Sequence, residues 1–364
     1  MKKYIFLFAF STFSLLGFAQ AREFKTIKDI KTTEVISQGN TGTCWSFSAS
    51  SFLESEIFRI NKKEVDLSEM FNVRHTYDTK AWNYVMRQGE TQFSQGGLGH
   101  DVINSISKHG FVPNSFYTGL LNGELKHNHS ELIDSLKPIL DTYISKKSTD
   151  WKTPVTTLLD KKLGKPVTNF FYEGVNYTPK SFMASLNIKP EDYVSLTSFN
   201  HVPFNEKFVL EIPDNFSNGS FYNVTLDELV ETTLEALKKG YTVELDCDVS
   251  EKTFSSKDGI AILPKTAVKD LMQLTDEIKV TQALRQQEFE NYNTTDDHLM
   301  HITGFLEDQN GTLFFKVKNS WGTTYAGNNG YIYMSEAYFR MKTISVLVHK
   351  ESIPKTIAKN IGLR

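Results

Sequence analysis

The chain has 364 residues, a formal net charge of −3 at pH 7 and 40% hydrophobic residues, of which the aromatic ones alone make up 13% of the chain. This is the composition of an ordinary globular protein with enough apolar side chains for a large core. The charge balance argues against a nucleic-acid partner and against a polybasic membrane-binding surface. No repeat or low-complexity linker divides the chain, so we expect one elaborated domain.

Residues 1–21 have the pattern of a secretory signal peptide. A basic start, Met1-Lys2-Lys3, precedes an almost wholly apolar run from Tyr4 to Phe18, and Ala19-Gln20-Ala21 is typical of a cleavage site. The apolar run is shorter than the ~20 residues that span a bilayer. We therefore expect cleavage near Ala21, export to the periplasm or the medium, and no membrane anchor.

The first segment with a candidate catalytic residue is a loop rich in Gly, Asn and Thr that ends at Thr43-Cys44-Trp45. Apolar residues at helical spacing from Trp45 to Ile60 predict a helix with one buried face. With Thr43 as N-cap, Cys44 would lie in the first turn, where free N–H groups and the helix dipole favour an anion. A thiolate is such an anion, and a lowered pKa makes a cysteine nucleophilic. A buried structural cysteine is the alternative that this segment leaves open.

The second cysteine, Cys247, lies in a strand predicted over 241–249. We interpret it as a small buried hydrophobic residue. Two cysteines do not make a disulfide framework, and a nucleophilic Cys44 would have to stay free. A Cys44–Cys247 disulfide is the alternative in an oxidising compartment.

The middle of the chain is expected to mix helices and strands. Its apolar spacing, caps and turns predict the following elements: helices from Leu67 through Tyr77, around 102–110, over much of 111–165, from Thr178, over 226–239 and around 267–289, and a strand over 193–197.

Two motifs in this region have features of ligand sites, but both lack residues that such sites need. The glycine-rich turn at 94–99 lacks both G-x-G-x-x-G and the P-loop lysine, which excludes nucleotide binding. His127 and His129 have no acidic or cysteine ligand in register, and we interpret them as an exposed, solvated pair on a helix. We therefore expect no metal site and no cofactor.

Two strands joined by a hairpin turn at Asp308–Gly311 are expected near the C-terminus. The first contains His298 and His301, and the second ends in Asn319-Ser320-Trp321-Gly322. Because side chains alternate along a strand, residues three apart point to opposite faces. Only one of the two histidines can therefore face Cys44.

The order of these segments resembles that of papain-like cysteine peptidases. Gly42-Thr43-Cys44-Trp45 is similar to the nucleophile segment of that family, although its first Cys is absent here. Asn319-Ser320-Trp321-Gly322 resembles the motif at the end of a later strand, and His298 has the family's spacing of six residues before Gly304. The resemblance implies an α+β, two-lobed fold with a helical lobe and an antiparallel β lobe. It also assigns His301 to the core or the second face.

The resemblance further implies a Cys44–His298–Asn319 triad. His298 would hold Cys44 as a thiolate and protonate the leaving amine, while Asn319 would fix the imidazole ring. The side-chain amide of Gln38 and the Cys44 N–H would form the oxyanion hole.

Substrate binding is assigned by the same resemblance. Glycine lets a second backbone approach closely, so Gly96 and Gly97 would pair with the main chain of a substrate peptide. Trp45 and Trp321 would lie beside the reacting groups, and Trp321 would shield the His298–Asn319 hydrogen bond from water.

The separation of Cys44 and His298 is 254 positions, compared with ~130–150 in papain and the cathepsins. The chain therefore carries an insertion at roughly 115–290, and residues 22–364 are assigned to one peptidase domain. Within the insertion, Thr178–Phe182 and Asp246–Val249 are similar to the bleomycin hydrolase and aminopeptidase C branch. That branch implies a thiol aminopeptidase that acts on peptides with a free N-terminus and assembles as a hexamer.

Three alternatives stay open. In that branch a C-terminal arm caps the cleft, whereas here the chain ends at Arg364, soon after the last shared segment at Ile353-Pro354, so the protein could be an endopeptidase with an open cleft. A papain-like scaffold can also serve as a non-catalytic peptide-binding module. The same residues could transfer an acyl group to an amine rather than to water.

Overall fold

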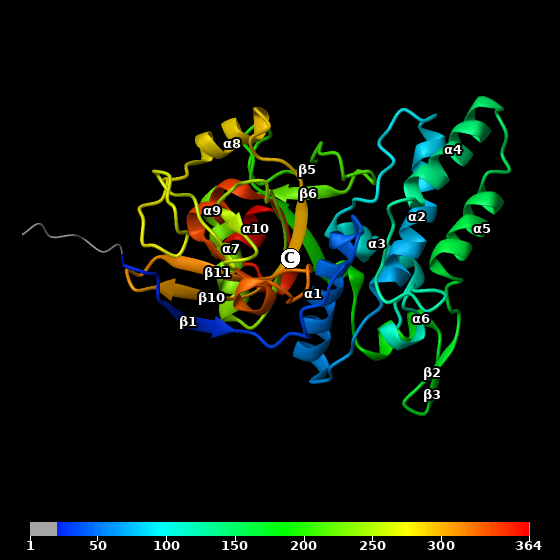
Figure 1. Ribbon diagram of the computed structural model, residues 1–364, viewed down its shortest axis with the longest axis horizontal. Helices are drawn as coiled ribbons and strands as arrows, with labels where there is room; N and C mark the ends of the chain where they lie inside the picture. The colour runs from blue at the N-terminus through cyan, green and yellow to red at the C-terminus, as the bar shows by residue number, and fades with distance from the viewer. Residues whose placement is uncertain (1–19, 364) are drawn as a thin grey trace, which may run out of the picture.

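The computed structural model describes residues 20–363 and divides them into two lobes (Figure 1). Most of the predicted signal peptide falls on residues 1–19, outside the described part. The helical lobe has six helices, of which α1 lies nearest the sheet: α1 (Cys44–Asn61), α2 (Glu69–Met86), α3 (Gly99–His109), α4 (Leu132–Ser145), α5 (Lys152–Leu163) and α6 (Pro179–Ser185). A small hairpin joins them, made of β2 (Phe170–Tyr172) and β3 (Val175–Tyr177).

The other lobe is built on one large sheet whose strand order is β5-β6-β4-β13-β7-β10-β11-β12-β9-β8, with β1 paired to β10. Its strands are β1 (Phe24–Asp29), β4 (Tyr193–Thr197), β5 (Lys207–Val209), β6 (Ser220–Asn223), β7 (Val243–Cys247), β8 (Phe254–Ser255), β9 (Ile260–Ala261), β10 (His298–Asp308), β11 (Leu313–Lys318), β12 (Tyr331–Ser335) and β13 (Thr343–His349). The pairing is antiparallel as expected, except that β12–β9 and β4–β6 are parallel.

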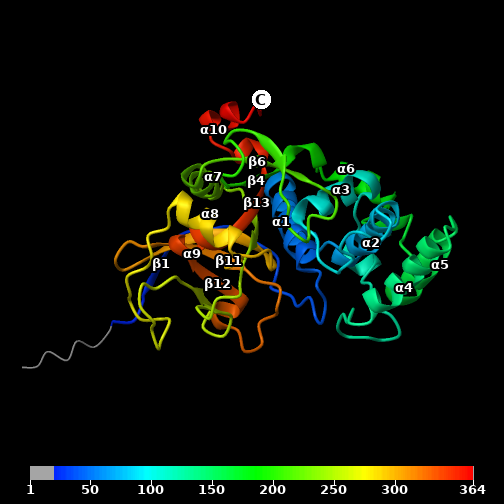
Figure 2. The same cartoon turned by 90° about the horizontal axis from the view of Figure 1, so that it is seen from above.

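Four helices accompany this sheet (Figure 2): α7 (Leu226–Lys238), α8 (Gln282–Glu290), α9 (Glu336–Lys342) and α10 (Lys355–Asn360). Single 3₁₀ turns occur at Asn114–Phe116, Pro190–Asp192, Gly327–Gly330 and Lys350–Ser352. Ile357 of α10 and the following Ile361 are buried in the core of the β lobe, so the described end of the chain packs against this lobe. None of the helices in residues 20–363 is long and apolar enough to cross a membrane.

Helix α1 lies between the lobes and begins at Cys44, as predicted (Figure 1). The prediction of a single buried face was wrong, because every residue from Cys44 to Ile57 is buried. The predicted cap was also only half right. Thr43 occupies the N-cap position, but its hydroxyl is engaged with that of Thr41 at 2.7 Å and does not cap the helix. Packing from both lobes, rather than a cap, holds the start of this helix.

The predicted helix around 267–289 is mostly absent, and only α8 forms there. Thr281 starts α8 by accepting a hydrogen bond from the Leu284 N–H. Before it, the Glu277 carboxylate accepts from the Leu263 N–H and from the Ser335 hydroxyl, which ties the segment to the sheet. These long-range bonds replace the local bonds that a helix would make.

The strand register brings the candidate catalytic residues His298 and Asn319 to the same end of β10 and β11. His298 is the first residue of that strand and lies opposite Cys247 of β7. His301 lies opposite Lys318, the last residue of β11, so Asn319 follows directly at the same end of the sheet. Cys247 is fully buried, and both cysteines are free thiols, which rules out the alternative disulfide in this structure.

Candidate active site

The Cys44 thiol lies at the N-terminus of α1, against the start of β10. Its side chain is 8% exposed, and its sulfur receives a hydrogen bond from the backbone N–H of Leu299, the residue after His298. Burial raises the pKa of the Cys44 thiol to about 12, and the Leu299 N–H works against that shift. The structure thus brings Cys44 beside the strand that carries His298.

His298 and Asn319 are in direct contact. The imidazole Nε2 of His298 lies 2.8 Å from Oδ1 of Asn319, and this oxygen also accepts from the Ser320 N–H at 2.7 Å. Because that oxygen can only accept, Nε2 carries the proton and Nδ1 has a free lone pair. Burial lowers the pKa of His298 to about 4, while the bond to Asn319 opposes that shift.

The indole of Trp321 covers the imidazole. The two rings stack with centroids 4.6 Å apart and planes 30° apart, although Trp321 itself is 42% exposed. The large ring therefore keeps bulk water off the His298–Asn319 pair from one side.

Gln38 is bound to the segment that carries Asn319. Its N–H donates to the Ser320 carbonyl at 2.8 Å, and its Oε1 accepts from the Ser320 hydroxyl at 2.6 Å. The side-chain Nε2 donates to the carbonyl of Thr41 at 2.7 Å. The loop before Cys44 is thus held against the end of β11 by side chain and main chain together.

His127 and His129 do not form the exposed helical pair that the sequence suggested. They lie in a loop before α4, and His129 is buried. The loop pairs with the nucleophile loop, because the Asn40 N–H donates to the His127 carbonyl and the His129 N–H donates to that of Asn40. A Cβ on Gly39 would lie 2.4 Å from the His127 oxygen. The histidine segment therefore supports the nucleophile loop through its backbone.

The glycine-rich turn lies beside Trp45. The Trp45 indole N–H donates to the Gln95 carbonyl at 3.0 Å, and a Cβ on Gly97 would touch the same indole at 3.2 Å. Gly96 is covered on its outer side, because a Cβ there would lie 1.9 Å from Oδ2 of Asp214. The structure thus places both predicted glycines near the nucleophile helix, but one of them is already in contact with another segment.

His301 makes different contacts from His298. It is fully buried, and its Nδ1 lies 2.9 Å from the hydroxyl of Ser51 in α1. Lys318 donates to that same hydroxyl at 2.9 Å. His301 therefore belongs to a polar contact between α1 and the sheet, whereas His298 contacts Asn319.

Three carboxylates near the thiol were missed by the sequence analysis. The negative charges of Asp214, Asp296 and Asp246 all raise the pKa of Cys44. Asp296 stands two residues before His298, which was a local hint. Asp246 and Asp214 come close only through the sheet and a loop of the insertion.

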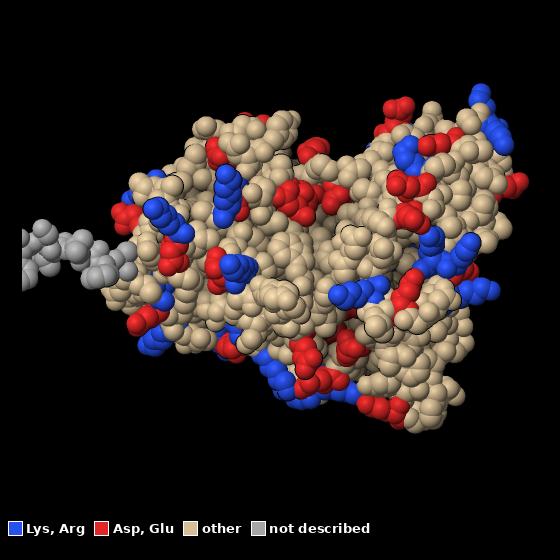
Figure 3. Space-filling model, viewed as in Figure 1, with Lys and Arg blue, Asp and Glu red and all other residues tan. Residues whose placement is uncertain are grey.

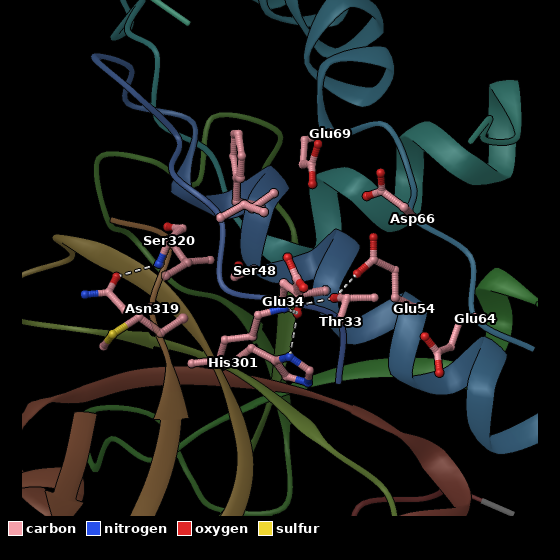
Figure 4. Close-up of a pocket in the computed structure, with 16 residues that line it drawn as sticks. Thr33, Glu34, Ser48, Glu54, Glu64, Asp66, Glu69, His301, Asn319 and Ser320 are labelled. Carbon is pink, nitrogen blue, oxygen red and sulfur yellow. Dashed lines mark hydrogen bonds between the residues drawn. The ribbon is translucent and has the colours of Figure 1, made fainter. Parts of the chain in front are cut away.

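A cavity of about 450 Å³ lies between α1, the start of α2 and β10 (Figure 4). Oxygens of Glu54, Asp66 and Glu69 lie within 4.8 Å of one another on one side of it, so these residues are the nearest approach to a cation site in residues 20–363. Burial raises the pKa of Glu54 to about 7 and holds that of Glu69 well above its usual range. Shared protons can therefore relieve the repulsion in this group without a metal ion.

Comparison with protein families gives two matches. The model of the peptidase C1-like family matches residues 77–362, and the model of the papain family of cysteine proteases matches residues 20–124.

Several characterised proteins are similar over most of this chain. Aminopeptidase C of Listeria monocytogenes is 26% identical over 90% of this chain and 83% of its own length. Cysteine proteinase 1, mitochondrial, of Saccharomyces cerevisiae is 23% identical over 93% of this chain and 79% of its own length. Among solved structures, pepW from Lactobacillus rhamnosis shares the fold, with a TM-score of 0.71 at 20% identity, over 93% of this chain and 84% of that one.

Proposed function

This chain belongs to the peptidase C1-like family and is a cysteine-type peptidase, and we propose that it is an aminopeptidase whose triad is Cys44, His298 and Asn319. The observation that carries the assignment of residues is the 2.8 Å bond between His298 and Asn319 at the strand that adjoins the Cys44 sulfur. Relatives named aminopeptidase C and aminopeptidase G support the class of reaction.

We infer the protonation states from burial and from the bond between His298 and Asn319. Burial alone favours a neutral Cys44 thiol and a neutral His298 ring, since it raises one pKa and lowers the other. Nδ1 of His298, the nitrogen not bound to Asn319, takes the thiol proton. Each charge of the resulting ion pair offsets the desolvation cost of the other, because opposite charges attract strongly in a low-dielectric site.

The reaction then proceeds by acyl transfer. The sulfur of Cys44 attacks the carbonyl carbon, and an S–C bond forms as the C–N bond breaks. Nδ1–H of His298 gives its proton to the leaving amine. Water then attacks the thioester and gives a proton to Nδ1 of His298. A C–O bond forms as the S–C bond breaks, which releases the acid and restores the Cys44 thiolate. The Gln38 amide and the Cys44 N–H would stabilise the oxyanion. One N–H of the Gln38 amide donates to the Thr41 carbonyl, and its second N–H is the donor for the oxyanion.

The test uses two coumarin amides of one amino acid, one with a free and one with an acetylated amino group, and Cys44→Ala as the blank. We expect hydrolysis of the free form only, because an aminopeptidase requires the free N-terminus. Equal hydrolysis of both forms would instead identify an endopeptidase with an open cleft. No hydrolysis above the blank would favour a peptide-binding module.

We also propose that the protein is exported, on the strength of its N-terminal pattern. Arg22 is buried, and its guanidinium donates to the Asp308 carboxylate at 2.8 Å, so a chain that begins there would keep its first residue anchored. N-terminal sequencing of the protein from its native source should begin at or next to Arg22. A chain that retains residues 1–19 would contradict export with cleavage.

A further inference from the structure

A loop at Leu210–Gly219, between β5 and β6, crosses from the β lobe to the helical lobe. It is fastened to α3, where Nε2 of His100 lies 3.0 Å from the Ser217 hydroxyl. It is also fastened to α2, where the Lys80 ammonium lies over the Phe216 ring at 4.3 Å. Asn215 closes the loop on itself by bonding with both ends, the carbonyl of Leu210 and the N–H and carbonyl of Gly219. The loop is therefore a built strap with fixed ends.

The strap places the Asp214 carboxylate on the glycine-rich turn. Both of its oxygens and its carboxyl carbon lie within 2.2 Å of where a Cβ of Gly96 would stand. The Ser94 hydroxyl and the Gln92 amide donate weakly to Oδ1, at 3.4 and 3.3 Å. A peptide chain that paired with this turn would meet the Asp214 carboxylate at Gly96.

The same residue links the strap to the His298 strand. The Asp214 N–H donates to Oδ2 of Asp296 at 3.3 Å, and the charges of both residues reach the Cys44 thiol. Asp246 is fully buried on β7, and its carboxyl shares a hydrogen bond with that of Asp296. Oδ1 of each of these two carboxyl groups has no hydrogen-bond partner within residues 20–363. Three carboxyl groups thus lie close enough to raise the pKa of the Cys44 thiol, and beyond the bond between Asp246 and Asp296 no group of residues 20–363 donates to Oδ1 of either.

Within residues 20–363, no lysine or arginine donates to Oδ1 of Asp246 or of Asp296. The charge of Lys80 lowers the pKa of Asp214, but the Lys80 Nζ donates to the carbonyls of Ser94 and Gly96. Acidic side chains also gather on the surface over β5 and β6, at the boundary between the lobes (Figure 3). The excess of negative charge favours a positively charged group of the substrate at this end of the cleft.

We propose that the strap closes the cleft at Gly96 and that the Asp214 carboxylate binds the free α-ammonium group of the peptide substrate. This inference rests on the proposed peptidase function and adds the residue that restricts cleavage to the N-terminus. The ammonium group donates to Asp214, and the neighbouring Asp296 adds negative charge. An acetylated N-terminus loses the charge and brings its acyl group against the strap.

The test compares Asp214→Asn with the wild type on the free and acetylated coumarin amides. Asparagine keeps the shape but removes the charge, so kcat/KM for the free amine should fall by about 30-fold, as expected for an ammonium that loses its charged partner. The value for the acetylated form should stay within about 3-fold, so the ratio between the substrates falls. The exposed Asp134→Asn is the matched control and should leave both values unchanged. An unchanged ratio in Asp214→Asn would overturn the proposal.

A second variant tests the strap as a barrier. Replacing residues 211–218 with a short glycine linker should let the enzyme cut acetylated and internal bonds. Increased cleavage of every substrate with no change in the free-to-acetylated ratio would make the strap an inhibitory cover and would overturn the binding role of Asp214.

Alkylation separates this proposal from the proposed function. Aminoacyl chloromethyl ketones, with the amine free or acetylated, label Cys44 without turnover, and mass spectrometry gives the labelling rates. The wild type should be labelled faster by the free form, and Asp214→Asn should lose that preference. If the free reagent labels Cys44 faster than the acetylated one but no amide is hydrolysed, the proposed peptidase function is wrong and the binding of the amine by Asp214 is supported. If hydrolysis occurs but neither assay depends on Asp214, only the amine site fails.

Discussion

His298→Ala should lower kcat/KM for the free coumarin amide by about 10²- to 10⁴-fold, the range that a positioned general acid–base supplies. Without the imidazole, the buried Cys44 thiol keeps its proton, because burial raises its pKa to about 12 and only the Leu299 N–H opposes the shift. The leaving amine also lacks a proton donor. Both steps of acyl transfer lose the same residue, so the loss should appear in kcat as well as in kcat/KM.

The pH dependence of alkylation distinguishes this role from a structural one. In the wild type, iodoacetamide should react with Cys44 near neutral pH, since the ion pair with His298 supplies thiolate. In His298→Ala the reaction should require strongly alkaline pH. His201→Ala, at an exposed site on the β lobe, is the control and should follow the wild type. Neutral-pH labelling of a folded His298→Ala protein would show that the thiolate does not depend on this ring.

The parts of the site that the sequence could predict lie at the boundaries of secondary structure. Cys44 begins a helix, His298 begins a strand, and Asn319 follows one, and each boundary has a local pattern of turn residues or apolar spacing. Strand alternation predicts in the same way that His301 and His298 point to opposite faces. These features depend on neighbours in sequence, which is why a pattern could reveal them.

The parts that could not be predicted depend on contacts between distant segments. Helix α1 is buried on all sides because two lobes meet on it, which its own spacing cannot show. The segment around Glu277 is extended by bonds to Leu263 and Ser335 rather than helical. No local sequence pattern distinguishes Asp214 from other polar loop residues, because its contact with Gly96 depends on the path of the strap. Local propensity does not carry this information, since tertiary contacts override it.

Glu244→Gln should stabilise the protein at alkaline pH and have little effect at pH 4 to 5. Glu244 is 2% exposed, with Oε1 3.0 Å from the Ser48 hydroxyl and Oε2 against Gly99 at the start of α3. Burial raises its pKa from 4.5 to about 8, and the Ser48 hydroxyl opposes the shift only in part. Because the folded pKa is the higher one, the neutral carboxyl is favoured in the fold, and its contribution to stability is lost as pH rises from about 4.5 to about 8.

The size of the effect follows from two opposing terms. At 1.36 kcal/mol per pKa unit, the shift corresponds to about 5 kcal/mol, whereas the N-terminus of α3 favours the charged form by up to about 2 kcal/mol. The desolvation cost is the larger of the two terms. At pH 9 the free energy of unfolding of Glu244→Gln should therefore exceed that of the wild type by about 3 to 5 kcal/mol. Urea unfolding at pH 5, 7 and 9 in a Cys44→Ala background measures this difference. Glu124→Gln, at an exposed site, is the control, and its free energy of unfolding should change with pH as that of the wild type does. If the free energy of unfolding of Glu244→Gln also followed the wild type at every pH, the buried carboxyl would be charged in the folded protein.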